Sequence, residues 1–217
     1  MNLRYYLGDV KNLFERIDRI GLFNTIRARL KNKGQGFIYI NQNTTLLLTK
    51  TGAFDVQKKA RFYFNESWEK KDNFHSMLGI DENATLQVNG FFTIYSGARV
   101  SVTPNARLVL GSGYINHGLS LNCFTHIEIG HDVAISDNVT IRDSDNHEII
   151  AEGYKSTLPI KIGNHVWIGM NVTILKGVTI GDGAIIAAGA VVNKSIPARC
   201  LAGGVPARVL KENVEWR

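Results

Sequence analysis

The feature that most constrains the fold of this chain is a repeat of six residues in its carboxyl half. From Ile162 onward an aliphatic residue opens every repeat, and the fifth position of each repeat is small or branched. The opening residues are Ile162, Ile168, Ile174, Ile180, Ile186 and Val192. The same frame extends upstream through Ile129, Ile135 and Ile141. A period of six fits neither the 3.6-residue turn of a helix nor the two-residue alternation of a strand, but it is typical of short strands and turns in a solenoid.

Three repeats of six residues would make one triangular coil of eighteen residues. Each aliphatic residue then lies above its counterpart eighteen places away, as Ile162 above Ile180. Gly, Asn and Asp fill the places between, and these residue types tolerate the left-handed backbone of tight corners. A sandwich of alternating strands would not hold a fixed period of six over six consecutive units. Between Gly36 and Val109 the interval is only near six, so we expect less regular coils there.

The amino-terminal segment has a different pattern. Over residues 3–30, apolar residues recur every three to four positions between basic ones, which predicts an amphipathic helical segment interrupted near Gly21. Two interpretations stay open: helices packed on the coils, or peripheral contact of residues 3–33 with an anionic membrane surface. We divide the chain into a helical segment (1–33), a β-helical domain (34–200, irregular over 34–109 and regular over 110–200) and a carboxyl-terminal tail (201–217).

Composition excludes several classes of protein. The 25 Lys and Arg exceed the 19 Asp and Glu by six, which favours an anionic partner such as a phosphorylated cofactor or a membrane surface. Nucleic acid is not expected, because no basic face is interleaved with aromatic residues. Two cysteines form no disulfide framework, no apolar run reaches the ~20 residues of a membrane span, and the amino terminus lacks the apolar stretch of a signal peptide. We expect a cytoplasmic protein, at the inner face of the membrane if its helical segment binds lipid.

The six-residue frame breaks once in its regular part. Ile141 and Ile162 are separated by one repeat plus fifteen residues, so a polar loop leaves the coil at about 142–161. Long loops on a regular scaffold are usually functional. This loop contains His147 among acidic residues, and imidazole, with an ordinary pKa of ~6.5, is the usual base for a hydroxyl or amine proton. The acidic residues are Asp143, Asp145, Glu148 and Glu152.

These motifs together resemble the hexapeptide-repeat acyltransferases. The resemblance covers about 110–211 and rests on the repeats, on the loop followed by the Val-Trp-Ile-Gly sequence at 166–169, and on the closing segment VNKSIPARCLAGGVPARVLK. It implies a mainly β, left-handed parallel β-helix with a short helical amino-terminal segment. Within this family, the chain resembles in particular the galactoside and maltose O-acetyltransferases and the enzymes that acetylate bacterial capsule and lipopolysaccharide sugars. The implied function is acetyl-CoA-dependent O-acetylation of a sugar hydroxyl in surface polysaccharide biosynthesis.

The resemblance also implies roles for single residues. His147 would be the general base in a direct transfer, Asn116 would contact the acceptor, and the Met170 backbone N–H would donate to the oxyanion. Residues implied to hold acetyl-CoA are Trp167, Met170, Ala188, Lys194, Arg208 and Lys211. No metal is expected, and the partners would be coenzyme A, a sugar or glycan acceptor and two further copies of the chain, in a homotrimer with shared sites.

Three alternatives stay open. A nucleotide-sugar N-acetyltransferase would use the same cofactor, although the nucleotide-binding unit usual in that group is not found. A zinc enzyme of the hexapeptide carbonic anhydrase type needs three protein ligands, for which His117, His126 and His131 are the candidates. A non-enzymatic hexapeptide scaffold would keep the repeats but would have no use for a loop that carries a histidine.

Overall fold

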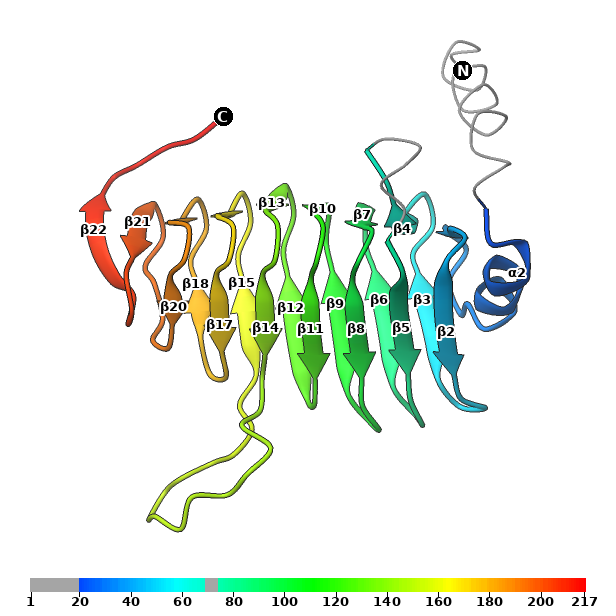
Figure 1. The fold of residues 1–217 in the computed structure, drawn as a ribbon, viewed down its shortest axis with the longest axis horizontal. Helices are drawn as coiled ribbons and strands as arrows, with labels where there is room; N and C mark the ends of the chain where they lie inside the picture. Colours follow the sequence, from blue (N-terminus) through cyan, green and yellow to red (C-terminus); the bar gives the residue numbers. More distant parts are fainter. Residues whose placement is uncertain (1–19, 69–73) are drawn as a thin grey trace.

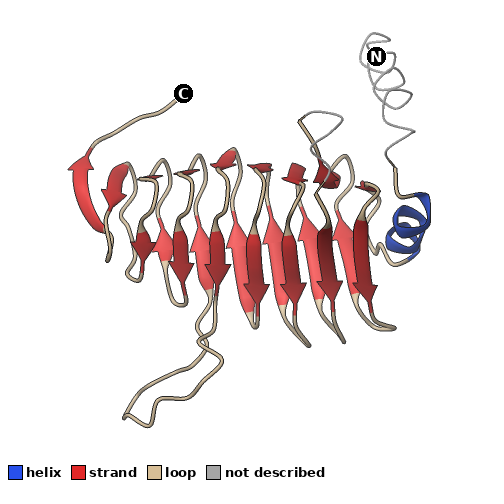
Figure 2. Ribbon diagram, viewed as in Figure 1, coloured by secondary structure: helices blue, strands red, loops and turns tan. Residues whose placement is uncertain are grey.

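The computed structural model describes residues 20–68 and 74–217. Within this part of the chain, the strands form three sheets that repeat along one axis, and one helix, α2 (Leu22–Leu30), lies at one end (Figures 1 and 2). The expected mainly β architecture with parallel, repeating coils is confirmed. The part of the helical pattern that falls on residues 3–19 lies outside the described residues.

Each sheet takes one strand from each of the six coils that contain β1 to β18, and sheets 1 and 2 continue beyond them. Sheet 1 consists of β1 (Phe37–Ile40), β4 (Arg61–Glu66), β7 (Phe91–Tyr95), β10 (Gly113–Ile115), β13 (Val133–Ile135), β16 (Trp167–Ile168), β19 (Ile185–Ile186), β21 (Cys200–Gly203) and β22 (Arg208–Glu212). Sheet 2 consists of β2 (Thr44–Leu48), β5 (Ser76–Ile80), β8 (Arg99–Val102), β11 (Ser120–Cys123), β14 (Thr140–Arg142), β17 (Thr173–Leu175) and β20 (Val191–Val192). Sheet 3 consists of β3 (Ala53–Val56), β6 (Thr85–Val88), β9 (Arg107–Leu110), β12 (His126–Ile129), β15 (Ile160–Ile162) and β18 (Thr179–Ile180).

The chain passes from sheet 1 to sheet 2, then to sheet 3, and back to sheet 1 in the next coil. A cross-section therefore has three corners. We call the turn from sheet 1 to sheet 2 the first corner, that from sheet 2 to sheet 3 the second corner, and that from sheet 3 to sheet 1 the third corner. Residues at the same corner of successive coils form a column along the axis of the β-helix.

Strand register confirms the spacing expected from the sequence. Ile162 pairs with Ile180 and Ile168 pairs with Ile186, each eighteen residues apart. Ile141 pairs with Ile174, which is fifteen residues more than the regular spacing, so the loop is a true insertion at the second corner. Because it starts and ends at that corner, the loop leaves the ladder of strands unbroken.

Coil length decides which side chains fill the interior. The ladder in the eighteen-residue coils is isoleucine and valine, all fully buried. The earlier coils are longer, with Ile38 paired to Phe62 across 24 residues. Their wider interior holds Phe54, Phe62, Phe64 and Phe92, also fully buried, because a close-packed core needs larger side chains to fill a wider space.

Glycine and asparagine serve the corners in two distinct ways. Asn171 and Gly183 have positive φ angles of 57° and 68°, in the left-handed region that these residue types tolerate. Gly169 does not, but a Cβ there would lie 2.7 Å from the backbone nitrogen of Ala188 in the next coil. The corner residues therefore set both the direction of the turn and the distance between coils.

Helix α2 covers the amino-terminal end of the coils. Its buried residues are Thr25 and Ala28, and the Thr25 hydroxyl both donates to the Ile40 carbonyl (3.1 Å) and accepts from the Ile40 N–H (3.0 Å). This half of the amino-terminal segment is thus packed on the first coil. The opposite side of the helix exposes Leu22 and Phe23, as well as other apolar residues.

The carboxyl-terminal end is closed by strands. β21 continues sheet 1 in parallel with β19, so the last coil extends past residue 200, where the sequence analysis placed the start of the tail. β22 then reverses and pairs with β21 in antiparallel fashion. Residues 213–217 run back along the third corner, where the Val214 N–H donates to the Arg199 carbonyl.

The inward ladder predicts where stability resides. Replacing Ile180 by Ala should lower the free energy of unfolding by about 2–5 kcal/mol, because it leaves a cavity between coils that cannot close. Thr179 precedes it on β18 with its side chain exposed, so Thr179→Ala should change the free energy by less than about 1 kcal/mol. Denaturant unfolding at one protein concentration measures both, and equal effects would contradict the inward ladder.

Candidate active site

The base of the loop is fixed by a buried carboxylate. Asp143 follows β14 and is fully buried, and its two oxygens accept hydrogen bonds from the N–H groups of Phe124 (2.7 Å), Thr125 (2.8 Å) and His126 (3.0 Å), and from the Thr125 hydroxyl (3.1 Å). A carboxylate that accepts four hydrogen bonds is well compensated for burial. Asp143 therefore ties the loop to the preceding coil and does not contact His147.

A second acidic residue, Asp145, fixes the segment in which the loop leaves the coil, which we call the neck. The Asp145 carboxylate lies 2.5 Å from the Lys176 ammonium and accepts a hydrogen bond from the Tyr154 hydroxyl (2.6 Å). These two groups, Lys176 first, hold the pKa of Asp145 below its usual value. The Lys176 ammonium also donates to the Lys155 carbonyl (2.6 Å) and lies 4.1 Å from the centre of the Tyr154 ring. The loop is thus braced against the next coil at the same corner.

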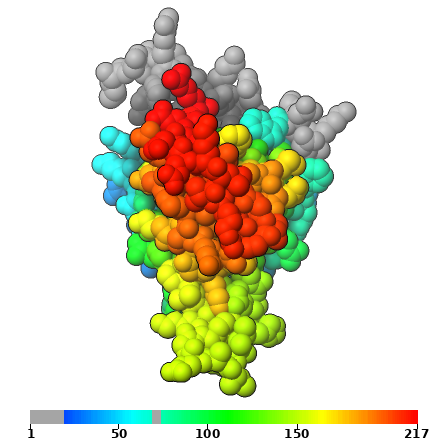
Figure 3. Space-filling model, turned by 90° about the vertical axis from the view of Figure 1, so that its left-hand side faces the viewer, coloured from blue at the N-terminus to red at the C-terminus, as the bar shows by residue number. Residues whose placement is uncertain are grey.

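His147 lies beyond this neck and is exposed. Figure 1 shows the loop hanging from the coils after β14, and Figure 3 shows that it projects from the body of the molecule. The Tyr154 hydroxyl donates to the His147 backbone carbonyl (3.2 Å), but the imidazole makes no hydrogen bond with any residue that the structure describes. Ile149 and Ile150, which follow it, are also exposed. The neck of the loop is therefore fixed, whereas the ring nitrogens of His147 are accessible to solvent.

Three other predicted residues share the first corner. Asn116, Met170 and Ala188 follow β10, β16 and β19 respectively, and so lie in one column. The N–H groups of Gly169 and Asn171 donate to carbonyls, but the Met170 N–H between them has no acceptor among residues 20–68 and 74–217. A free backbone donor at a turn can stabilise an oxyanion.

The remaining predicted residues lie on or near sheet 1. Trp167 faces outward on β16 and is 43% exposed, and the register places it in one row with Ile185, Leu201 and Lys211. Arg208 is exposed at the start of β22. Lys194 is exposed at the second corner, on the same side as the loop.

The structure therefore divides the predicted residues. His147 and Lys194 belong to the second corner, whereas Asn116, Met170 and Ala188 belong to the first. The strands of sheet 2 separate these two columns. One chain alone does not bring the imidazole next to the predicted oxyanion donor.

A group beside Trp167 was not predicted from the sequence. The Trp216 ring stacks on His165 at 4.2 Å, its indole N–H donates to the His165 carbonyl (2.9 Å), and it lies 6.2 Å from the Trp167 ring. Asp132 (2.6 Å from the His165 Nδ1) and then the Trp216 carbonyl raise the pKa of His165 above its usual value. Two features of the sequence could have indicated this group: a histidine directly before the Val-Trp sequence, and a tryptophan 51 residues further along the chain.

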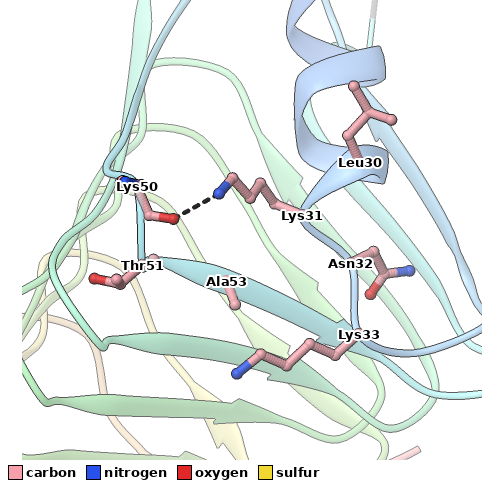
Figure 4. Close-up of a pocket in the computed structure, with 8 residues that line it drawn as sticks. Leu30, Lys31, Asn32, Lys33, Lys50, Thr51 and Ala53 are labelled. Carbon is pink, nitrogen blue, oxygen red and sulfur yellow. Dashed lines mark hydrogen bonds between the residues drawn. The ribbon is translucent and has the colours of Figure 1, made fainter.

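Neither of two hollows on the surface is built from the predicted residues. One of about 380 Å³ lies against Trp216, between His165 and Arg199. The other, of about 230 Å³, lies at the amino-terminal end, where Lys31, Lys33 and Lys50 surround it (Figure 4).

The histidines of the zinc alternative are dispersed. His117 lies at the first corner, His126 on β12 of sheet 3 and His131 at the third corner. Among residues 20–68 and 74–217 no three potential ligands are grouped as a metal site requires. In the same part of the chain, no helix has the length and apolar character needed to cross a membrane.

Comparison with known proteins agrees with these features. A family model described as bacterial transferase hexapeptide (six repeats) matches residues 159–194. The galactoside O-acetyltransferase of Escherichia coli K12 is 37% identical over 164 residues, which are 71% of this chain and 76% of that protein. The polysialic acid O-acetyltransferase of Escherichia coli O1:K1 is 36% identical over 134 residues, which are 60% of this chain but only 42% of that protein.

A solved structure of galactoside acetyltransferase in complex with coenzyme A has 26% sequence identity and a TM-score of 0.41, and the match covers 79% of this chain and 65% of that one. The level of identity and the coverage of the Escherichia coli K12 protein identify the family. The chain is an acetyltransferase, and it belongs to the hexapeptide-repeat acetyltransferase superfamily.

Proposed function

We propose that the protein transfers the acetyl group of acetyl-CoA to a hydroxyl group of a sugar, in the biosynthesis of a bacterial surface polysaccharide. The observation that carries this proposal is the loop at the second corner, which is fixed at its neck by Asp143 and Asp145 and presents an unpaired His147 imidazole. The names of two relatives describe O-acetylation of a galactoside and of polysialic acid. The relative named for galactosides supports a sugar, and the other supports a polymer.

His147 is the general base of the proposed reaction. Its imidazole takes the proton of the acceptor hydroxyl as that oxygen attacks the thioester carbonyl carbon, and it returns the proton to the coenzyme A sulfur as the C–S bond breaks. Burial, together with the charge of Asp143, raises the pKa of the Cys123 thiol to about 12, so this cysteine is not a nucleophile at neutral pH. Cys200 is also buried. Direct transfer without an acyl-enzyme is the consistent route.

The first corner and sheet 1 supply the proposed cofactor wall. The free Met170 N–H stabilises the oxyanion, and Ala188 leaves room for the pantetheine arm beside it. Trp167 and the apolar row behind it offer contact area for that arm, and Lys211 ends the row. Lys211, Arg208 and Lys194 are exposed cations that suit the cofactor phosphates.

The separation of the two columns leads to a proposed homotrimer. If the second corner of one subunit packs beside the first corner of another, His147 meets Asn116 and Met170 across the interface, and a three-sided prism repeats this contact three times. Sheet 1 offers a suitable packing surface, because its outward row includes Tyr39, Tyr63, Tyr114 and Trp167. A closed interface would also exclude water from the thioester.

Contact with an anionic membrane surface is a second proposal, for the amino-terminal end. Helix α2 exposes Leu22 and Phe23 at its start and Leu30 at its end. Leu30 lines the hollow in Figure 4 together with Lys33 and Lys50. The Lys31 ammonium instead donates to the Lys50 carbonyl (2.5 Å), so this cation is engaged within the protein and is not counted as a lipid contact. Apolar side chains beside free cations suit lipid with anionic headgroups.

The role of His147 is tested by substitution. His147→Ala should lower the rate of acetyl transfer by about 10²–10⁴-fold, the contribution of a general base, while coenzyme A affinity is unchanged. His131→Ala removes another exposed histidine and serves as the control. Acceptors are screened by mass shift, and lability in mild alkali distinguishes an O-acetyl ester from the N-acetyl product of the nucleotide-sugar alternative. Near-normal turnover by His147→Ala would refute the assignment.

Sharing of the site is tested by mixing two inactive variants. His147→Ala and Asn116→Ala subunits, exchanged at equal amounts, should recover roughly a quarter of wild-type sites, because some interfaces then combine both intact residues. Activity is measured before and after exchange, with sedimentation to establish the trimer. No recovery from subunits shown to exchange would mean that each chain uses its own two residues.

Membrane contact is tested with lipid vesicles. The full chain should sediment with anionic vesicles at low salt and less so at high salt, because surface charges are screened. Leu22→Ser with Phe23→Ser, and separately Lys33→Gln with Lys50→Gln, should each weaken sedimentation. If the wild-type protein stays in the supernatant at low salt, the exposed side of α2 has another role.

A further inference from the structure

Four aromatic rings gather at the first corner, upstream of the predicted cofactor wall. Trp68 stacks on Tyr95 with ring centres 4.6 Å apart and planes at 2°, and Tyr95 lies 5.9 Å from the His117 ring at 25°. Phe74 meets the edge of His117 at 6.1 Å. Trp68 and Phe74 are each 60% exposed. We call these four residues the aromatic cluster.

The aromatic cluster follows the axis of the β-helix. Trp68 follows β4, Tyr95 ends β7 and His117 follows β10, and these strands are neighbours in sheet 1. The stack therefore spans two strand spacings, on the order of 10 Å. A single monosaccharide ring would cover only part of this length, so the surface suits a chain of sugars.

Two polar atoms adjoin the rings and have no hydrogen-bond partner in the described part of the chain. They are the Asn116 Oδ1 and the His117 Nε2, both shielded from solvent. Buried polar atoms are nearly always paired, so an unpaired neighbouring couple points to a missing partner. Asp137 accepts from the His117 N–H (3.1 Å) and lies 3.8 Å from its Nδ1, so Nε2 is the ring nitrogen left without a polar neighbour.

We propose that the aromatic cluster is the acceptor subsite and that it binds an oligosaccharide or polysaccharide chain. This inference rests on the proposed function. The apolar face of one sugar ring packs on the exposed Trp68 ring, and the next sugars lie along the edges of Tyr95 and His117. Their hydroxyls form hydrogen bonds with the Asn116 Oδ1 and the His117 Nε2 once these two side chains turn outward. Met170 lies in the same column two strands further on, so a glycan held here extends toward the predicted oxyanion donor.

Kinetics with acceptors of different length test the subsite. Trp68→Ala should raise the acceptor KM about tenfold, with larger effects for longer acceptors, while kcat and the KM for acetyl-CoA change less than twofold. Trp68→Phe should restore most of the affinity, because it keeps a ring. Leu47→Ala, an exposed apolar residue on sheet 2, is the matched control. The probes are β-galactosides, maltooligosaccharides and oligosialic acids.

Direct binding separates failure of this inference from failure of the proposed function. If the wild-type protein binds one of these glycans by calorimetry, Trp68→Ala abolishes this binding and no glycan is acetylated, the proposed function fails and the subsite stands. If it acetylates a glycan and Trp68→Ala leaves the acceptor KM unchanged, the subsite is overturned. Sedimentation of Trp68→Ala gives a further check. If this variant no longer forms an oligomer, the rings belong to a contact between copies of the chain, and the subsite is overturned.

Discussion

The structure depends on the return of each strand to the place directly above its counterpart. Eighteen residues accomplish this in the later coils, where Ile168 stacks on Ile186. Each coil then contributes hydrogen bonds on three sides and aliphatic side chains to one common interior. Because this register is set by buried ladders, any additional residues must leave the coil at a corner. The fifteen-residue loop is the largest such departure in the regular part of the chain.

That loop combines two kinds of acidic residue with opposite surroundings. Asp143 is enclosed and compensated by backbone N–H groups, whereas Asp145 is partly exposed and neutralised by Lys176. Both anchor the loop to neighbouring coils, one before it and one after it. The proposed base His147 is thereby positioned by its backbone, and no carboxylate among residues 20–68 and 74–217 of the same chain forms a hydrogen bond with its ring.

Much of the fold could be predicted because a period of six is visible without any knowledge of contacts. The position of the loop followed from one break in that frame. Contacts between residues distant in the sequence could not be predicted: Asp143 lies near His147 in sequence, yet its carboxylate faces a turn of the previous coil. The aromatic cluster was missed because the earlier coils vary in length, so no regular spacing relates Trp68 to Tyr95. The stacking of Trp216 on His165 was missed because Trp216 lies in the tail, outside the six-residue frame and 51 residues from His165.

The reversal of the chain at β22 affects whether molecules of this protein can associate end to end. A stack of parallel coils has an open edge at each end, to which a second stack could add by the same pairing and so form a fibre. Helix α2 covers one edge. At the other, β22 runs against the direction of the coils and carries Arg208, Lys211 and Glu212 along an exposed strand. On sheet 1, an incoming coil would meet a strand of the wrong polarity and a row of charges, which disfavours growth of a filament at this end.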